Sequence, residues 1–253
     1  MTGHAVFDLD GTLVDSVGIC ADILNSMLID RGLSGDISVA RARGYVSMGG
    51  TRMVEGLLGD ACGDPASEIA EFRARYASLP TPRSSLFPGV REALAALWAD
   101  GVRLSICSAK PQHLCEKVLI DLELDNLFDV VVGSAPGRPV KPDPEHLFAT
   151  LRLANGWRGR SCFIGDSEVD HALAVTAGVP IVLMTTGYLD PASDISGAIL
   201  VDSFSEIPTV VSEILGLRPP SPPAWREVAA PQLLRTEGST PETDRHLQTI
   251  VDF

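Results

Sequence analysis

The sequence predicts an α/β fold: a doubly wound, Rossmann-like parallel sheet with a small four-helix cap domain inserted after its first strand. Short apolar runs alternate with helical patterns along most of the chain, which is typical of βαβ units and a parallel sheet. Residues 17–84 interrupt this alternation, because they contain helical patterns but no convincing strand. In addition, two carboxylates, Asp8 and Asp10, directly follow the first apolar run, and ligands bind at the carboxyl ends of the strands in such sheets.

The expected core strands are short and apolar, as buried parallel strands are. They cover residues 4–8, 102–107, 129–133, 161–165, 180–185 and 198–201. The expected core helices cover residues 89–100, 111–122, 143–154, 168–177 and 205–215. Inside the interrupting segment, glycines separate four helical patterns, because glycine favours turns over helix interiors. These patterns cover residues 17–31, 38–44, 50–58 and 66–78.

This pattern divides the chain into three parts. We expect residues 1–16 and 85–217 to form the α/β core, and residues 17–84 to form the helical cap. Residues 218–253 begin as a Pro-rich linker and continue as a polar tail. The composition of this tail favours disorder, and the alternative is docking on the core or on a neighbouring subunit through its few apolar side chains.

Composition and charge exclude several functional classes. The formal net charge of −13 argues against nucleic acid or an anionic membrane as a partner. No apolar run reaches the roughly 18 residues of a membrane-spanning helix, and the first strand starts too early for a signal peptide. The five cysteines are scattered and form no Cys-x-x-Cys pair, which argues against zinc and fits a reducing cytoplasm. We therefore expect a cytoplasmic monomer or homodimer.

Four motifs follow one another along the core. Residues 8–12 read Asp-Leu-Asp-Gly-Thr, Ser108 ends the second expected strand, Lys141 precedes a proline, and residues 165–170 read Gly-Asp-Ser-Glu-Val-Asp. In this order the four motifs resemble those of the haloacid dehalogenase superfamily. Within it, the chain is most similar to bacterial phosphoglycolate phosphatases over roughly residues 1–217, although the similarity is weaker in the cap.

The resemblance implies hydrolysis of a small phosphorylated metabolite, with 2-phosphoglycolate the first candidate, through an aspartyl-phosphate intermediate. Asp8 is then the nucleophile, which divides one difficult displacement into two easier steps. Asp10 is the general acid and base. Ser108 and Lys141 bind the phosphoryl group, the lysine as a point charge.

The resemblance also implies a magnesium ion and residues that support it. Asp8, Asp166 and the main-chain carbonyl of Asp10 would hold Mg²⁺, which prefers oxygen ligands. Asp170 and Thr12 are expected to orient these ligands rather than to do chemistry. Glu168 is assigned only to the helix dipole, and Lys110 is left out of the expected site.

Specificity is expected to come from the cap and from the end of the second strand. Arg41, Arg43 and Arg52 flank Gly49 and Gly50, a flexible break between two cap helices that closure would bring toward the leaving group. Arginine pairs well with a carboxylate such as that of glycolate. The expected substrate-binding residues are therefore Arg43, Arg52, Gly49, Gly50 and Ala109.

Other activities of the superfamily stay open or are disfavoured. A phosphatase for a sugar or polyol phosphate would share the same motifs, and a sugar-phosphate mutase would share Asp8 and Asp10. The cap has neither lysine nor histidine to bind a bisphosphate, which disfavours the mutase, and its lack of lysine excludes Schiff-base phosphonate cleavage. Asp10 argues against a dehalogenase, which lacks this carboxylate. A catalytically silent binding protein is the remaining alternative, because fold alone does not fix function.

Overall fold

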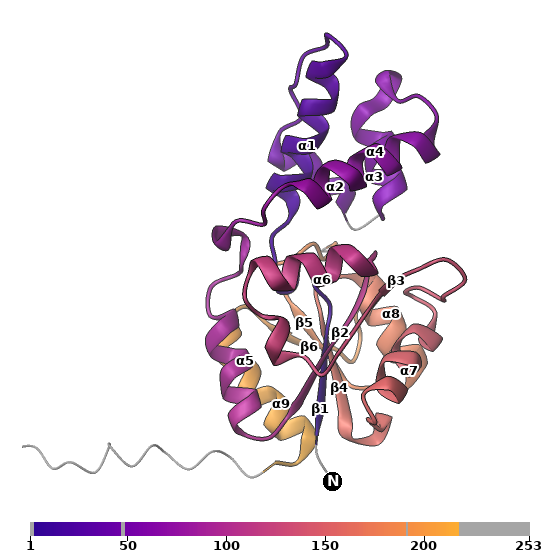
Figure 1. The fold of residues 1–253 in the computed structure, drawn as a ribbon. Helices are drawn as coiled ribbons and strands as arrows, with labels where there is room; N and C mark the ends of the chain where they lie inside the picture. Colours follow the sequence, from indigo (N-terminus) through magenta and orange to yellow (C-terminus); the bar gives the residue numbers. More distant parts are fainter. Residues whose placement is uncertain (1–2, 47–48, 191, 218–253) are drawn as a thin grey trace, which may run out of the picture. The chain divides into compact units, whose positions relative to one another are not determined.

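The computed structural model describes residues 3–46, 49–190 and 192–217. Within these ranges, six parallel strands form one sheet in the order β3-β2-β1-β4-β5-β6 (Figure 1). The strands are β1 (His4–Phe7), β2 (Arg103–Pro111), β3 (Val130–Ser134), β4 (Ser161–Gly165), β5 (Ile181–Met184) and β6 (Ile199–Val201). This order confirms the predicted Rossmann-like α/β core. The tail expected over residues 218–253 lies outside the described residues.

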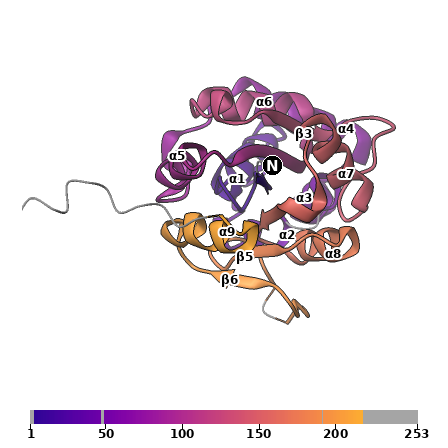
Figure 2. The same ribbon diagram turned by 90° about the horizontal axis from the view of Figure 1, so that it is seen from below.

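Helices cover both faces of this sheet (Figure 2). The core helices are α5 (Val90–Ala99), α6 (Gln112–Asp121), α7 (Pro144–Leu153), α8 (Glu168–Ala177) and α9 (Ile207–Leu215). Helix α5 contacts α9, and α7 contacts α8. Successive residues of a strand point to opposite faces, so Ala5 and Phe7 join one buried cluster while Val6 joins another.

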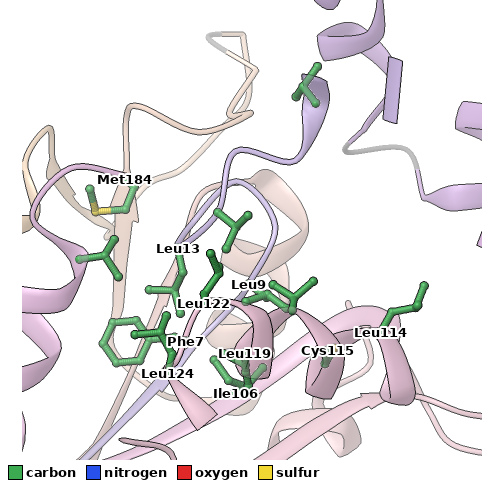
Figure 3. Close-up of a cluster of buried hydrophobic side chains, with 14 of the residues drawn as sticks. Phe7, Leu9, Leu13, Ile106, Leu114, Cys115, Leu119, Leu122, Leu124 and Met184 are labelled. Atoms are coloured by element: carbon green, nitrogen blue, oxygen red, sulfur yellow. The ribbon is translucent and has the colours of Figure 1, made fainter. Parts of the chain in front are cut away.

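The larger apolar cluster connects the sheet to the helices on one face. Figure 3 shows Phe7 of β1, Ile106 of β2 and Leu119 of α6 together in this cluster. All three side chains are essentially inaccessible to solvent. Each contributes roughly 1.5–3 kcal/mol by leaving water, so the strand that carries Asp8 is firmly held.

Four helices lie between β1 and α5, as the sequence predicts, and we call them the helical insertion (residues 17–78). They are α1 (Val17–Asp30), α2 (Val39–Val46), α3 (Gly50–Leu58) and α4 (Pro65–Ser78). Asp64 caps α4, accepting a hydrogen bond of 2.9 Å from the amide of Ser67, with Pro65 in the first turn. In the described part of the chain, no helix is long and apolar enough to cross a membrane.

Two chain segments connect the helical insertion to the core, and they run side by side. Val14 forms an antiparallel bridge with Leu86, and the amide of Asp15 donates a 2.7 Å hydrogen bond to the carbonyl of Ser85. Val14 is fully buried. Both segments therefore leave the core at one place, directly beside the end of β1.

The end of β2 differs from the sequence-based prediction. The strand was expected to stop at residue 107, but it continues to Pro111, which pairs with Ser134 of β3 after a register shift. This additional pairing places Ser108, Ala109 and Lys110 on the strand itself. Residues 108 and 110 of an extended strand point to the same side.

Candidate active site

The carboxyl ends of the central strands bring the sequence motifs together. Asp8 directly follows β1, Ser108 lies near the end of β2, and Asp166 directly follows β4. Lys141 comes from the loop before α7. All four side chains line one pocket, together with Asp10. The central strands of a parallel sheet end at the same edge, which is why residues so far apart in sequence meet here.

Asp8 is a buried carboxylate that is ion-paired with Lys141. The Nζ atom of Lys141 lies 2.9 Å from Asp8 Oδ1. Burial, together with the negative charge of Asp170, raises the pKa of Asp8 to about 6, against the opposing effect of Lys141.

Lys141 lies between two carboxylates. Its Nζ atom donates a 2.6 Å hydrogen bond to Asp170 Oδ1 and lies close to Asp8. Burial alone would lower the pKa of Lys141, but the charges of Asp170 and Asp8 outweigh it and hold the pKa above its ordinary value. The side chain is therefore a fixed positive charge beside the nucleophile position.

Hydrogen bonds hold both the carboxylate and the backbone amide of Asp166. Thr12 Oγ1 donates a 2.8 Å bond to its Oδ1, and the amide of Tyr188 donates a 2.8 Å bond to its Oδ2. Its own amide donates a 3.1 Å bond to Asp170 Oδ2. Burial and the nearby charges of Asp170 and Asp8 raise the pKa of Asp166 well above its ordinary value. Thr12 and the amide of Tyr188 thus bind this carboxylate, and Asp170 binds the backbone amide of the same residue.

Two glycines allow the backbone to approach Asp166 closely. Gly11 has a φ of +84°, and a Cβ atom there would lie 2.1 Å from Asp166 Oδ2. A Cβ atom on Gly187 would lie 2.2 Å from the Cβ atom of Asp166. Neither contact is sterically possible, so both positions require glycine for Asp166 to keep its place.

The acidic residues fit a divalent cation. Asp8, Asp166 and Asp170 each offer a carboxylate oxygen within 4.8 Å of the others. Asp170 already accepts bonds from Lys141, Ser167 and the amide of Asp166. The three carboxylates outnumber Lys141, the cation that pairs with two of them, and the pKa of both Asp8 and Asp166 is raised in part by neighbouring negative charge. Asp8 and Asp166 therefore suit Mg²⁺, a hard cation that binds oxygen.

Asp10 pairs with a residue that the sequence prediction left out. The Nζ atom of Lys110 lies 3.0 Å from Asp10 Oδ1 and 2.9 Å from Asp10 Oδ2. It also lies 4.0 Å from the ring centroid of Tyr76. Lys110 therefore lines the pocket, although it was left out of the expected site. The Ser-Ala-Lys sequence at the end of a strand was the available signal, because it directs Ser108 and Lys110 to one side.

The helical insertion forms the opposite wall of the pocket. Gly49 and Gly50 line it, as does Ala109 of β2. Of the expected arginines, neither Arg43 nor Arg52 is among the described lining residues. The other described residues of the insertion that line the pocket are Cys20, Val46, Met53, Ile69, Phe72, Arg73 and Tyr76.

The expected substrate-binding role of Arg43 is not supported, because its charge is used elsewhere. Arg43 Nη2 lies 3.0 Å from Asp15 Oδ2, and the guanidinium lies 5.5 Å from the centroid of the Tyr188 ring. Asp15 belongs to the first connection between core and insertion. The arginine that lines the pocket is Arg73 on α4, which the spacing around Gly49 did not indicate.

Comparison with known proteins decides the family. The family model of haloacid dehalogenase-like hydrolases matches residues 5–184. This chain is a haloacid dehalogenase-like hydrolase. The resemblance found in the four sequence motifs is thereby confirmed, and the matched range includes Asp8, Ser108, Lys141 and Asp166.

Individual relatives of this hydrolase agree with that assignment. It is 34% identical to the phosphoglycolate phosphatase of Rhodospirillum rubrum over 218 residues. This alignment covers 82% of this chain and 90% of the relative. It is 32% identical over 213 residues to the plasmid-encoded phosphoglycolate phosphatase of Cupriavidus necator, with 82% and 92% covered. The crystal structure of a predicted phosphoglycolate phosphatase from Haemophilus somnus superposes with a TM-score of 0.72 at 26% identity, covering 83% of this chain and 97% of that one.

Proposed function

We propose that this hydrolase is a Mg²⁺-dependent phosphatase that cleaves a small phosphate monoester, with 2-phosphoglycolate as the leading substrate. The observation that carries the proposal is the pairing of Asp8, a buried carboxylate, with the fixed positive charge of Lys141 in one pocket. That arrangement suits a nucleophile that must approach an anionic phosphoryl group. The names of the relatives support the choice of substrate.

In the first half of the reaction, a carboxylate oxygen of Asp8 attacks phosphorus and the bond from phosphorus to the ester oxygen breaks. Asp10 gives its proton to the departing alkoxide. Lys141 and Ser108 stabilise the charge on the transferring phosphoryl oxygens. A Mg²⁺ ion held by Asp8, Asp166 and the main-chain carbonyl of Asp10 would supply further neutralisation of that charge when bound.

In the second half, water attacks the phosphorus atom of the aspartyl-phosphate. Asp10, now a carboxylate, accepts a proton from this water, and the bond between phosphorus and Asp8 breaks. Inorganic phosphate leaves, Asp8 returns as a carboxylate, and Asp10 is protonated again for the next substrate. One side chain therefore serves as acid and then as base without net proton consumption.

The helical insertion serves as a cap that excludes bulk water and limits the leaving group. The side chains that it contributes to the pocket are mainly apolar. Among the described residues, its polar groups there are those of Arg73, Tyr76 and Cys20. A sugar or polyol needs several hydrogen-bond partners for its hydroxyl groups, because unpaired polar groups are costly when buried. This wall therefore favours a compact leaving group such as glycolate over a sugar.

A substrate panel tests the proposal. The purified protein is assayed with 2-phosphoglycolate, several sugar phosphates and p-nitrophenyl phosphate, each with Mg²⁺ and with EDTA. We expect Mg²⁺-dependent release of phosphate, with the largest kcat/KM on 2-phosphoglycolate. Full activity in EDTA, or a sugar phosphate as the best substrate, would contradict the metal or the substrate part of the proposal, respectively.

A further inference from the structure

Lys110 is a buried cation that faces the same pocket as the nucleophile. Its side chain is only 7% exposed, and it is one of three lysines in the chain. Burial alone would lower the pKa of Lys110, but the charge of Asp10 outweighs this effect and raises the pKa above its ordinary value. The proposed mechanism assigns Lys110 no role, although a buried charge of this kind is rare without one.

Lys110 lies beside the residue that acts on the ester oxygen in the proposed mechanism. Both carboxylate oxygens of Asp10 lie within 3.0 Å of the Lys110 ammonium. A group of the leaving alcohol that is close to the ester oxygen therefore comes near this ammonium.

Tyr76 supplies an independent indication that a polar ligand binds here. Its side chain is 2% exposed, lines the pocket, and lies with its ring 4.0 Å from the Lys110 ammonium. Its hydroxyl group is buried and has no hydrogen-bond partner among the described residues. Buried hydroxyl groups are normally paired, so this one lacks an acceptor that a ligand would supply.

The chemistry of a small ester fits both groups. In 2-phosphoglycolate, the carboxylate is attached to the same carbon atom as the ester oxygen. Asp10 must reach that oxygen, and Lys110 contacts Asp10 directly. A carboxylate in this position therefore lies within reach of the Lys110 ammonium. The apolar side chains around it, including Phe72 and Leu114, strengthen such a charge pair by excluding water.

We propose that Lys110, together with the Tyr76 hydroxyl, binds an acidic group on the leaving alcohol and so selects phosphate monoesters that carry a carboxylate beside the ester carbon. This inference rests on the proposed phosphatase function and adds the substrate class and the residue that determines it. The substrate carboxylate accepts an N–H bond from Lys110 and an O–H bond from Tyr76.

The test compares three esters in wild-type protein and in Lys110→Met. The esters are 2-phosphoglycolate, ethyl phosphate, which lacks the carboxylate but has a similarly poor leaving group, and p-nitrophenyl phosphate, which needs little acid catalysis. We expect kcat/KM for 2-phosphoglycolate to fall roughly tenfold to a hundredfold, the value of a hydrogen bond to a charged group. The ratio of kcat/KM for 2-phosphoglycolate to that for ethyl phosphate should fall by about tenfold or more, whatever loss the three esters have in common.

Three further variants serve as controls. Lys117→Met removes a lysine that pairs with Asp121 outside the pocket and should leave all three values close to wild type. Lys110→Arg keeps the charge and should retain most of the preference for 2-phosphoglycolate. Arg73→Met removes the cation that the described part of the helical insertion contributes to the pocket, and it should reduce activity on the three esters to a similar extent.

Glycolate inhibition gives a readout that needs no variant. Glycolate should inhibit the wild-type hydrolysis of p-nitrophenyl phosphate competitively, and ethylene glycol at the same concentration should not. Equal losses on all esters in Lys110→Met, a selective loss in Arg73→Met instead, or equal inhibition by both alcohols would overturn the assignment of Lys110. Absence of hydrolysis of every ester by the wild type would instead count against the phosphatase function itself.

Discussion

The two walls of the pocket differ in how strongly their polar groups are connected. On the core side, Asp8, Lys141, Asp166 and Asp170, which we call the core cluster, are nearly all buried and joined by ion pairs and hydrogen bonds. On the side of the helical insertion, Val46, Met53, Ile69 and Phe72, which we call the apolar wall, make no polar contacts through their side chains. Arg73 and Tyr76 are the strongly polar side chains of that wall among the described residues.

This difference separates the chemistry from the choice of substrate. A buried network of charges tolerates little change, because removing one member leaves its partners unpaired. An apolar wall tolerates substitution more readily, provided that volume is conserved. We therefore expect changes in the core cluster to affect all phosphate esters equally, and changes at Lys110 or Tyr76 to distinguish between esters.

The largest effect is expected for Asp8→Asn. The amide cannot form the aspartyl-phosphate, so hydrolysis of every ester should fall by several orders of magnitude, as for a covalent nucleophile. Steady-state kinetics with p-nitrophenyl phosphate and 2-phosphoglycolate measures this loss. Asp202→Asn, at an exposed carboxylate outside the pocket, is the matched control. Near wild-type hydrolysis by Asp8→Asn would exclude the proposed nucleophile.

Lys141→Met should impair both activity and stability. It leaves Asp8 and Asp170 without their shared cation, and breaking a buried ion pair costs roughly 3–5 kcal/mol. Urea denaturation near neutral pH, without metal, measures the free energy of unfolding. The loss should shrink at lower pH, where Asp8, whose pKa is raised to about 6, is protonated. An unchanged midpoint of urea denaturation would show that the ion pairs of Lys141 do not stabilise the core cluster.

Gly187→Ala should weaken metal binding without removing any ligand. A Cβ atom at this position would lie 2.5 Å from Asp166 Oδ2 and 2.6 Å from the carbonyl oxygen of Gly11. Asp166 would have to move, and a change that disturbs a metal ligand typically lowers metal affinity about tenfold to a hundredfold. The concentration of Mg²⁺ giving half-maximal activity measures the effect. Gly197→Ala is unsuitable as a control because its φ is +84°, whereas Gly18→Ala meets no atom within 4 Å.

The stabilising effect of Mg²⁺ should increase with pH. In the metal-free protein the pKa of Asp8 is raised from 3.8 to about 6. The folded state therefore holds this proton more tightly than the unfolded state, and its contribution to stability is lost as pH rises from about 4 through about 6. Mg²⁺ neutralises the charge of the ionised carboxylates. The increase in Tm that Mg²⁺ causes should therefore be larger at pH 7 than at pH 5. Asp8→Asn should show a smaller pH dependence of that shift, and an equal shift at both pH values in the wild type would contradict this account.

The smallest effect is expected for Arg43→Ala. Its ion pair with Asp15 is partly exposed to solvent, at 40% and 35% for the two side chains. Such pairs contribute about 0.2–1 kcal/mol at most, so Tm should change only slightly. The ratio of kcat/KM for 2-phosphoglycolate to that for p-nitrophenyl phosphate should stay within about twofold of wild type, since Arg43 is not a described lining residue of the pocket. A selective tenfold rise in KM for 2-phosphoglycolate would restore the original prediction for this arginine.

The sequence predicts the core better than the pocket wall, and the reason is physical. A strand followed by Asp-Leu-Asp-Gly-Thr limits where Asp8 and Asp10 can lie, because the sheet fixes where each strand ends. The helical patterns of the insertion were equally clear, and all four helices are present within a few residues of their predicted bounds. Periodicity identifies helices and apolar faces, since it reflects burial along one element.

Contacts between the insertion and the core are not contained in that periodicity. Arg43 was predicted from its closeness in sequence to Gly49, but its guanidinium pairs with Asp15 at the connection to the core. Lys110 was left out because only the hydroxyl position of Ser-Ala-Lys matches the second motif. The pairing of Pro111 with Ser134 extends the strand past Lys110, and that pairing depends on a distant part of the chain. Both differences concern long-range contacts.

The central claim, that Asp8 forms a covalent phospho-intermediate, is open to direct chemical trapping. The protein is mixed with Mg²⁺ and 2-phosphoglycolate, quenched in acid within the first turnover, and treated with borohydride, which reduces an aspartyl-phosphate to homoserine. Peptide mass spectrometry then locates the modified residue. The account predicts homoserine at position 8 only, and none in a sample without substrate. Modification at another residue, or rapid hydrolysis with no modified aspartate at any quench time, would contradict it.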